Sequence, residues 1–262
     1  MRSCETSGGK STLVNRLVGR KIFKPSIDES TATICRIRNS NDPKKISCKV
    51  VGKNDQVIDE RSFESGQDEK IRKFTEENVD KNAQLASMEI DHVDVGLYFP
   101  FLKGNTLIVD TPGIGGSREL SDKMMKYLPN AVAFIFVSNV ANAGGVQRDR
   151  LVKIIQEVVR LHDEKDITCL DPRNALFISN KWDAVPQDER DEGWSKVQRE
   201  LKKHWPHLTS ENIFRTSLMS TKDKEPDFDA EFERFKERLA KVVERSQYTR
   251  QIKHLTSPCH IK

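Results

Sequence analysis

The sequence has few of the features that mark secreted, membrane-spanning or nucleic-acid-binding proteins. Its five cysteines among 262 residues are scattered, odd in number and form no C-x-x-C pair, which indicates reduced thiols rather than a disulfide framework. The longest apolar run, residues 131–137, is far shorter than the roughly 18 residues that span a bilayer, and no signal-peptide pattern is present. The 44 basic residues nearly balance the 40 acidic ones, so the net charge does not indicate nucleic-acid binding. We therefore expect a cytoplasmic protein.

Short apolar runs alternate with segments of helical periodicity along the chain. The apolar runs, each bounded by turn residues, lie at residues 107–109, 131–137, 175–178 and 213–214. Helices are predicted at residues 121–128, 147–162 and 192–205, and another with one apolar face from Phe228 onward. This alternation is typical of an α/β fold with a mainly parallel sheet and crossover helices.

A long segment, residues 23–104, follows the first predicted helix. It contains strand-like runs at residues 33–38, 46–51 and 91–99. Between them lies a polar stretch, residues 65–87, for which we expect a solvated helix. The segment is therefore interpreted as a large insertion.

The first motif that carries chemistry is "SGGKST" near the start of the chain. Gly9, Lys10 and Ser11 fit the end of the phosphate-loop pattern G-x-x-x-x-G-K-[ST], whereas Cys4 stands where the first glycine is expected. In such a loop Lys10 would reach the β- and γ-phosphates and Ser11 would ligate Mg²⁺, while the following helix, residues 12–18, would end at Gly19. This match alone leaves open an ordinary glycine-containing loop before a helix.

The second motif is "LIVDTPGIGG", in which an apolar strand ends at Asp110. An aspartate at the carboxyl edge of a parallel strand faces the ligand crevice. There it can hold Mg²⁺, commonly through water, while the N–H of Gly113 is placed to sense the γ-phosphate. The alternative is an ordinary strand-to-turn junction.

The third motif is "NKWD", residues 180–183, at the end of another apolar strand. The carboxylate of Asp183 can accept hydrogen bonds from the guanine N1–H and exocyclic amine, a donor pair that adenine lacks, while the stem of Lys181 covers the base plane. The run "IFRTSLMS" is a weaker fourth piece, which would place a loop at Ser217 against the base. A chance helix cap remains the alternative for the tetrapeptide alone, but three motifs in this order favour a guanine-nucleotide site.

Together, "ETSGGKSTLVNRL", "DTPGIGG" and "NKWD" resemble the large GTPases of the dynamin superfamily, especially mitofusin-like and bacterial dynamin-like members, over nearly the whole chain. The resemblance implies a three-layer P-loop GTPase domain over residues 1–244, with an extended first switch region within residues 23–104. It implies hydrolysis of GTP to GDP with Mg²⁺. The nucleotide would be contacted by Thr6, Ser7, Gly8, Gly9, Lys10, Ser11, Thr12, Asp110, Gly113, Asn180, Lys181, Asp183 and Ser217.

The resemblance also assigns roles in hydrolysis. Ser7 would contact the transferred phosphate, often with a monovalent cation, and Lys10 would act beside it. Thr31 would be the switch threonine that binds Mg²⁺ and positions the attacking water, with Thr33 as the neighbouring candidate. The metal set would be Ser11, Thr31 and Asp110. Thr6 stands where dynamins proper keep a catalytic glutamine, so the loop is closer to the mitofusin type.

Such GTPases pair their G domains in a nucleotide-dependent manner, and we expect the same partner here, with membrane contact only through a longer form. Residues 245–262 are expected to be a basic tail, either frayed or the truncated start of a helical neck. Because only a few residues precede the loop, we expect the first strand to be missing from an N-terminally shortened chain. The alternative function is a weakly binding or non-hydrolysing regulatory module that pairs with full-length relatives.

Overall fold

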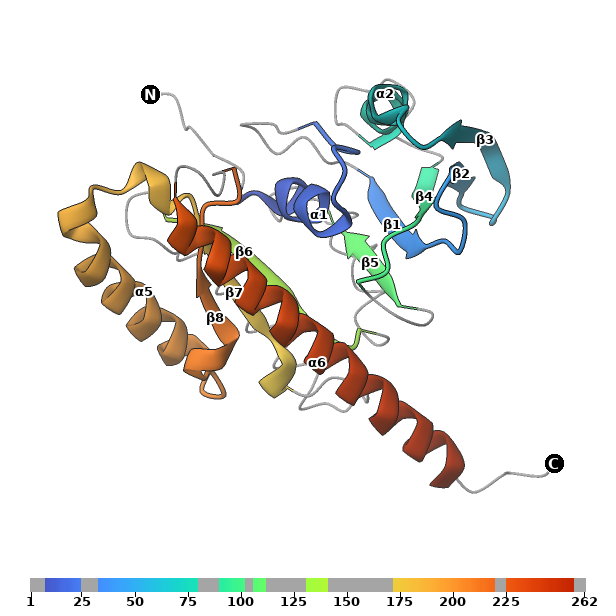
Figure 1. Ribbon diagram of the computed structural model, residues 1–262. Helices are drawn as coiled ribbons and strands as arrows, with labels where there is room; N and C mark the ends of the chain where they lie inside the picture. The colour runs from blue at the N-terminus through green and yellow to red at the C-terminus, as the bar shows by residue number, and fades with distance from the viewer. Residues whose placement is uncertain are drawn as a thin grey trace.

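The computed structural model describes residues 8–24, 33–79, 90–101, 106–111, 131–140, 172–219 and 225–256. Figure 1 shows the strands of these residues arranged in two sheets, with the long C-terminal helix running past both. The order of the larger sheet is β3-β2-β4-β1-β5, and that of the smaller sheet is β6-β7-β8. No helix within the described residues is long and apolar enough to cross a bilayer.

The five-stranded sheet is built mostly from the long insertion. Its strands are β1 (Ile34–Asn39), β2 (Lys45–Gly52), β3 (Val57–Glu64), β4 (Ile90–Leu97) and β5 (Leu107–Asp110). The β1–β4 pair is parallel, whereas β1–β5, β2–β3 and β2–β4 are antiparallel. Strand β3, at the outer edge of the sheet, is largely exposed and was not expected from the sequence. Its central charged residues, "DER", do not follow the apolar alternation by which a half-buried strand is recognised.

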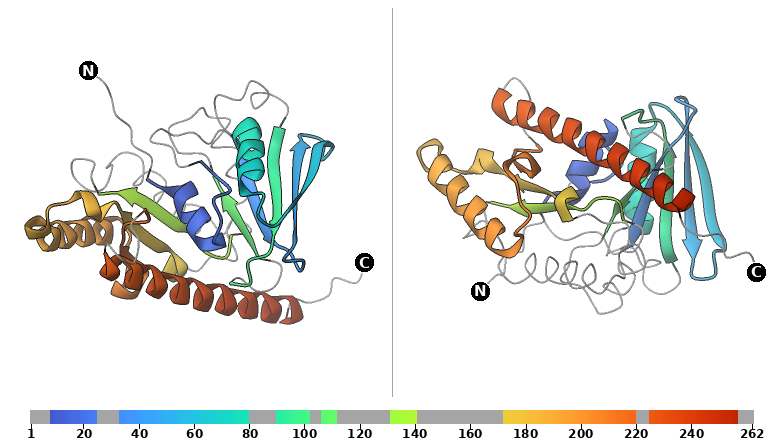
Figure 2. Two further views of the ribbon diagram at one scale, coloured as in Figure 1. Left: turned by 45° about the horizontal axis from the view of Figure 1, so that its top comes forward. Right: turned by 90° about the horizontal axis from the view of Figure 1, so that it is seen from below.

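The three-stranded sheet is wholly parallel and has a helix on each face. Its strands are β6 (Ile135–Asn139), β7 (Leu176–Asn180) and β8 (Ile213–Arg215). Successive side chains of a strand point to opposite faces, and in β7 Leu176 and Ile178 join one buried cluster while Phe177 joins another. The first cluster includes Phe235 of α6 (Pro226–Thr256), and the second includes Leu201 of α5 (Arg190–His204). This part of the molecule is therefore three-layered, as the views in Figure 2 show.

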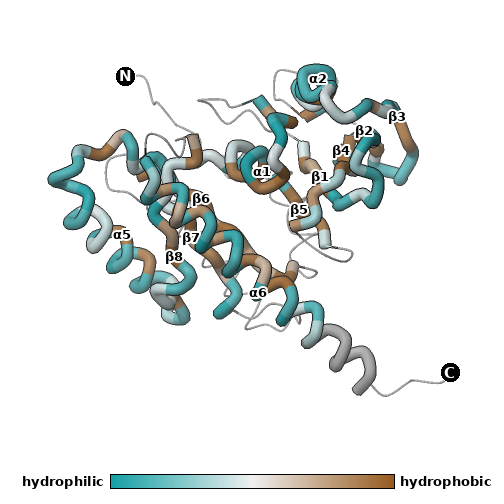
Figure 3. The backbone as a smooth tube through the Cα atoms, in the orientation of Figure 1, coloured by the Kyte–Doolittle hydropathy of each residue, from teal (hydrophilic) through white to brown (hydrophobic). Residues whose placement is uncertain are grey.

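Two further helices contribute to the main core: one follows the phosphate loop, and the other lies within the insertion. Helix α1 (Lys10–Val18) buries Leu13, Val14, Leu17 and Val18, as its apolar spacing predicted, and ends at Gly19, whose φ is 70°. Helix α2 is Asp68–Val79. The short 3₁₀ helices are η2 (Pro172–Asn174), η3 (Trp182–Ala184), η4 (Gln187–Glu189) and η5 (Ser210–Asn212). Figure 3 shows the hydrophobic strands β6 and β7 beside the largely hydrophilic α5.

The expectation of a solvated insertion helix was wrong for α2. Ile71 and Phe74 are 0% and 1% exposed and belong to the main core. The hydroxyl of Thr75 donates to the carbonyl of Ile22 at 2.6 Å, which fixes the helix against the segment after α1. Three apolar side chains, Ile71, Phe74 and Val79, were enough to bury one face of an otherwise charged helix.

The other predictions have mixed outcomes. Strands were correctly expected at the three runs of the insertion and at β5–β8, and the expected helix at residues 192–205 corresponds to α5. The backbone of residues 245–256 is helical and continuous with α6, so this part of the tail is not frayed. A helical neck remains a prediction. The helices expected at residues 121–128 and 147–162, and the absence of a strand before Gly8, concern parts of the chain outside the described residues.

Candidate functional site

The N-terminus of α1 lies among the ends of β5, β6 and β7, and the backbone there needs glycine twice. Gly9, the N-cap, has φ of 98°, in the left-handed region that favours glycine. A Cβ added to Gly9 would lie 2.4 Å from Nδ2 of Asn180, and one added to Gly8 would lie 2.6 Å from the carbonyl oxygen of Val137. The two glycines thus let the loop pack directly against β6 and β7. The N–H groups in the first turn of a helix have no acceptor within the helix, so the start of α1 suits an anion.

Ser11 in the first turn of α1 meets Asp110 at the end of β5. The hydroxyl Oγ of Ser11 donates to Oδ2 of Asp110 at 3.1 Å, although the two residues are 99 positions apart. Asp110 is only 3% exposed. Burial raises its pKa to about 6, and the nearby charge of Lys10 and the Ser11 hydrogen bond only partly oppose that rise. A buried carboxylate that is costly to ionise, beside a hydroxyl, is an oxygen donor set that suits Mg²⁺.

Asn180 joins the phosphate loop to the loop that follows β8. Its Nδ2 donates to the carbonyl of Gly8 at 3.0 Å, and its Oδ1 accepts the N–H of Leu218 at 2.9 Å. Asn180 is 2% exposed; its hydrogen bond with Leu218 is buried and the one with Gly8 is partly buried. The first residue of the NKWD motif therefore holds two loops together, a role that the motif itself did not reveal.

Lys181 and Asp183 of the motif are directed away from the core, whereas Trp182 is not. Lys181 has φ of 69°, a left-handed conformation that is uncommon for a residue with a side chain and concentrates at functional sites. Asp183 is exposed, and its Oδ1 accepts a hydrogen bond from the hydroxyl of Ser217. Trp182 between them is fully buried, with its indole N–H donating to Ser179 Oγ at 3.0 Å. Packing of the tryptophan therefore directs its two neighbours away from the core.

The structure brings together part of the expected site. Gly8, Gly9, Lys10, Ser11 and Thr12 form the loop and first turn of α1, next to Asp110 and Asn180, and Ser217 reaches Asp183.

Other expected site residues fall outside this group. Thr6, Ser7, Thr31 and Gly113 lie outside the described residues, as does Cys4. Thr33, the alternative to Thr31, is 1% exposed, and its N–H donates to the carbonyl of Val79 at 3.3 Å, which places it against the end of α2.

Sequence reasoning gave no reason to select Arg16, which also contacts the loop after β8. Its Nη1 donates to the carbonyl of Ser217 at 3.2 Å. The partner lies 201 positions away along the chain, so no local spacing could have indicated the contact.

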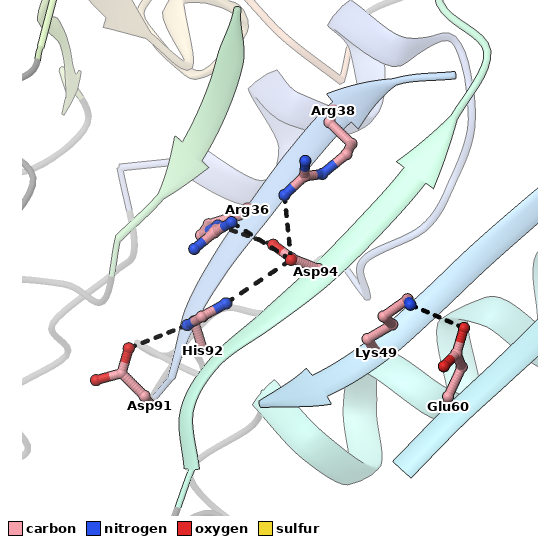
Figure 4. A network of polar contacts seen from close by, with 7 residues as sticks. All are labelled: Arg36, Arg38, Lys49, Glu60, Asp91, His92 and Asp94. Atoms are coloured by element: carbon pink, nitrogen blue, oxygen red, sulfur yellow. Dashed lines mark hydrogen bonds and ion pairs between the residues drawn. The ribbon is translucent and has the colours of Figure 1, made fainter. Parts of the chain in front are cut away.

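A separate polar network lies on β1 and β4, with Asp94 at its centre (Figure 4). Arg36 Nε is 2.8 Å and Arg38 Nη2 is 3.2 Å from Asp94, and His92 Nδ1 is 3.0 Å from Asp91. Burial lowers the pKa of His92, but its hydrogen bonds to Asp94 and Asp91 outweigh that effect and raise the pKa overall. Burial raises the pKa of Asp94, and His92 and the two arginines lower it overall. The charged groups of this network pair with one another, which indicates a structural role.

Comparison with known proteins gives a consistent family. The family model described as "Dynamin family" matches residues 5–169, more than half of the chain. An uncharacterised protein in the xynA 3′ region of Caldicellulosiruptor sp. (strain Rt8B.4) is 28% identical over 192 residues, covering 70% of this chain and 40% of that protein. The transmembrane GTPase fzo-1 of Caenorhabditis elegans is 21% identical over 193 residues, covering 68% of this chain and 21% of its own length.

Among solved structures, an oligomerised bacterial dynamin pair is similar with a TM-score of 0.56 and 14% identity. The match covers 94% of this chain and 39% of the other. Because only 14% of the aligned residues are identical, the likeness concerns the fold. The chain thus spans well under half the length of these relatives. The fold is the three-layer α/β fold of P-loop GTPase domains, and the chain belongs to the dynamin family.

Proposed function

We propose that this chain is a guanine-nucleotide-binding domain that hydrolyses GTP to GDP with Mg²⁺. The observation that carries the proposal is the hydrogen bond between Ser11 and Asp110 at the N-terminus of α1. Next to it lies the glycine loop, which Asn180 joins to residues 216–218 after β8, here called the base-side loop. One end of this arrangement suits a phosphate chain and its cation, and the other suits a base. The names of relatives such as the transmembrane GTPase fzo-1 agree with this reaction.

Each part of the site would have a distinct task. The N–H groups at the start of α1 and the Lys10 ammonium would hold the phosphates. Asp183 would accept the guanine N1–H and amine, and an adenine would leave this carboxylate without those donors. Ser11 and Asp110 would hold Mg²⁺, and the bound ion would supply positive charge beside the phosphates.

The remaining hydrolytic roles rest on the family resemblance. Ser7 would contact the transferred phosphate together with a monovalent cation, Gly113 would sense the γ-phosphate, and Thr31 would orient the attacking water. Thr6 would line the same loop. Nucleotide-dependent pairing of two such domains is proposed on the same ground, and it is supported by the oligomerised bacterial dynamin pair with which the fold is shared.

Base selectivity is the direct test. Bound fluorescent GDP should be displaced by GTP and not by the same concentration of ATP. Asp183→Asn should weaken GTP binding at least about tenfold, because the substitution replaces an acceptor oxygen by an N–H donor. Asp183 is exposed, so the variant should fold normally. Asp188, also exposed and on the neighbouring turn, supplies the control Asp188→Asn, for which no change is expected. Equal displacement by ATP would refute guanine recognition.

Turnover needs its own measurement. Single-turnover hydrolysis should be lost in Thr31→Ala with binding retained, and Lys10→Ala should abolish binding itself. Nucleotide binding without turnover by the natural chain would favour the alternative, a regulatory domain that acts by pairing with longer relatives.

A further inference from the structure

Arg16 links three elements around the base side of the site. From α1, its Nη1 donates to the carbonyl of Ser217 at 3.2 Å, and its Nη2 pairs with the carboxylate of Asp229 in the first turn of α6. The guanidinium carbon lies 4.1 Å from the centre of the Phe232 ring, also on α6. The position over the ring face and two separate N–H contacts make use of the arginine fork, which a lysine cannot reproduce.

The loop that Arg16 contacts, residues 216–218, is the one that touches the base-recognition motif. The hydroxyl of Ser217 donates to Asp183, and the N–H of Leu218 donates to Asn180 at 2.9 Å. On the inner side, the N–H of Thr216 donates to Ser179 at 2.9 Å and its carbonyl accepts the N–H of Trp182 at 3.3 Å. The strand end thus fixes Thr216, and Arg16 holds the next carbonyl along the loop.

The ion pair itself contributes little to stability. The side chains of Arg16 and Asp229 are 18% and 29% exposed, and ion pairs that reach solvent add little net free energy because desolvation and ordering offset the attraction. What the contacts do determine is where the Ser217 carbonyl, and with it the Ser217 hydroxyl, can lie.

We propose that Arg16 is a positioning residue for guanine recognition, which fastens loop 216–218 to the first turns of α6 and so keeps the Ser217 hydroxyl on Asp183. The proposal rests on the guanine binding proposed above. Arg16 contacts the Ser217 carbonyl, Asp229 and Phe232, so it would act on the base through Ser217. As a consequence, the contact between the base-side loop and Asp183 depends on where α6 lies.

The experiment compares the affinities for GDP and inosine diphosphate. Inosine diphosphate lacks only the exocyclic amine, from which Asp183 would accept a hydrogen bond. The preference for GDP should fall about tenfold in Arg16→Met, a factor equivalent to about 1.4 kcal/mol. Arg16→Lys should lose a similar part of the preference, because an ammonium lacks the two-armed geometry. Arg20→Met is the matched control: Arg20 follows the same helix and pairs with Asp68 at 2.8 Å, away from the loop, so its preference should stay unchanged.

A second readout needs no nucleotide. Amide hydrogen exchange of Leu218 should become faster in Arg16→Met than in wild type and Arg20→Met, because the loop loses one of its anchors. If wild type itself shows no preference for GDP, the proposed function fails while the exchange result still decides whether Arg16 positions the loop. An unchanged exchange rate, or equal loss of GDP and inosine diphosphate binding in Arg16→Met, would overturn the positioning role.

Discussion

At the scale of single residues, Asp110 is subject to opposite demands. Its carboxylate is buried at the end of β5, and burial raises the pKa from 3.8 to about 6. Folding therefore favours the protonated form, so the stability that protonation confers is present at low pH and is lost as the pH rises through about 6. At neutral pH the ionised carboxylate is useful to a cation and unfavourable to the empty fold, a conflict that is common at functional sites.

Replacement of Asp110 by asparagine should separate these two demands. Asp110→Asn keeps an oxygen that can accept the Ser11 hydroxyl but removes the charge, so the nucleotide-free protein should be more stable by about 1–3 kcal/mol at pH 7.5. Near pH 4 the difference should nearly vanish, because both side chains are then largely uncharged. Thermal unfolding with a metal chelator at the two pH values measures this. A variant that is less stable than wild type at pH 7.5 would contradict the argument.

At the scale of elements, the sequence was most informative where a buried strand ends in a polar residue. Asp110 and Asn180 could both be placed at strand ends, because apolar runs and turn residues are local signals. Helix α2 was predicted as a helix but with the wrong surroundings, since Ile71 and Phe74 are few apolar residues among many charges. Edge strand β3 was missed because an exposed strand has no apolar alternation.

Contacts between distant segments could not be predicted at all. The partners of Arg16 lie 201 and 213 positions away, and the bridge from Asn180 to Gly8 spans 172. The order of strands and helices in the fold brings these distant residues together, and no single segment of the sequence encodes that order. Sequence motifs thus identified candidate ligands of the nucleotide, while the residues that hold them in place emerged only from the fold.

The β1–β4 pair should show a pH dependence that comes from His92. Its raised pKa means that the protonated form is favoured by folding, so its contribution is complete below about 6.5, the usual pKa of histidine, and is lost as the pH rises through the higher value in the folded protein. His92→Asn should therefore destabilise the protein by about 1.5 kcal/mol or more at pH 6 and by less at pH 8.5. Chemical unfolding of both proteins at the two pH values measures the difference.

The comparison of wild type with His92→Asn has an internal control. Asp110 also makes stability depend on pH, but it is present in both proteins and cancels in the difference. Asp94 has a lowered pKa, so its own contribution is lost only as the pH falls below the range tested. A His92→Asn effect that does not change between pH 6 and pH 8.5 would mean that the imidazole does not change its charge over this range.

At the scale of the whole molecule, one core joins the two sheets. The main buried cluster contains Val93 of the five-stranded sheet, Leu17 of α1, Ile178 of the three-stranded sheet and Phe235 of α6. Phe235 is fully buried and its ring lies 5.3 Å from that of Phe214, in a T-shaped contact. The segments that hold the candidate nucleotide site therefore share a core with α6, which runs past both sheets in Figures 1 and 2.

The distribution of tryptophan lets this unity be tested. All three tryptophans, Trp182, Trp194 and Trp205, lie in or against the smaller cluster around α5 and the three-stranded sheet. Fluorescence thus reports on that part of the molecule, whereas far-ultraviolet circular dichroism reports on all of it. Because the shared core couples the two sheets, the two signals should give the same unfolding midpoint.

A substitution in α6 makes the test sharper. Phe235→Ala should lower the free energy of unfolding by about 3–5 kcal/mol and shift both signals together, although no tryptophan belongs to the cluster that contains Phe235. Tyr248→Ala, on the same helix but 66% exposed, should change stability by less than about 0.5 kcal/mol. If Phe235→Ala moved the circular dichroism transition and left the fluorescence transition in place, the sheets would unfold separately, and α6 could not transmit its position to the base-side loop through a common core.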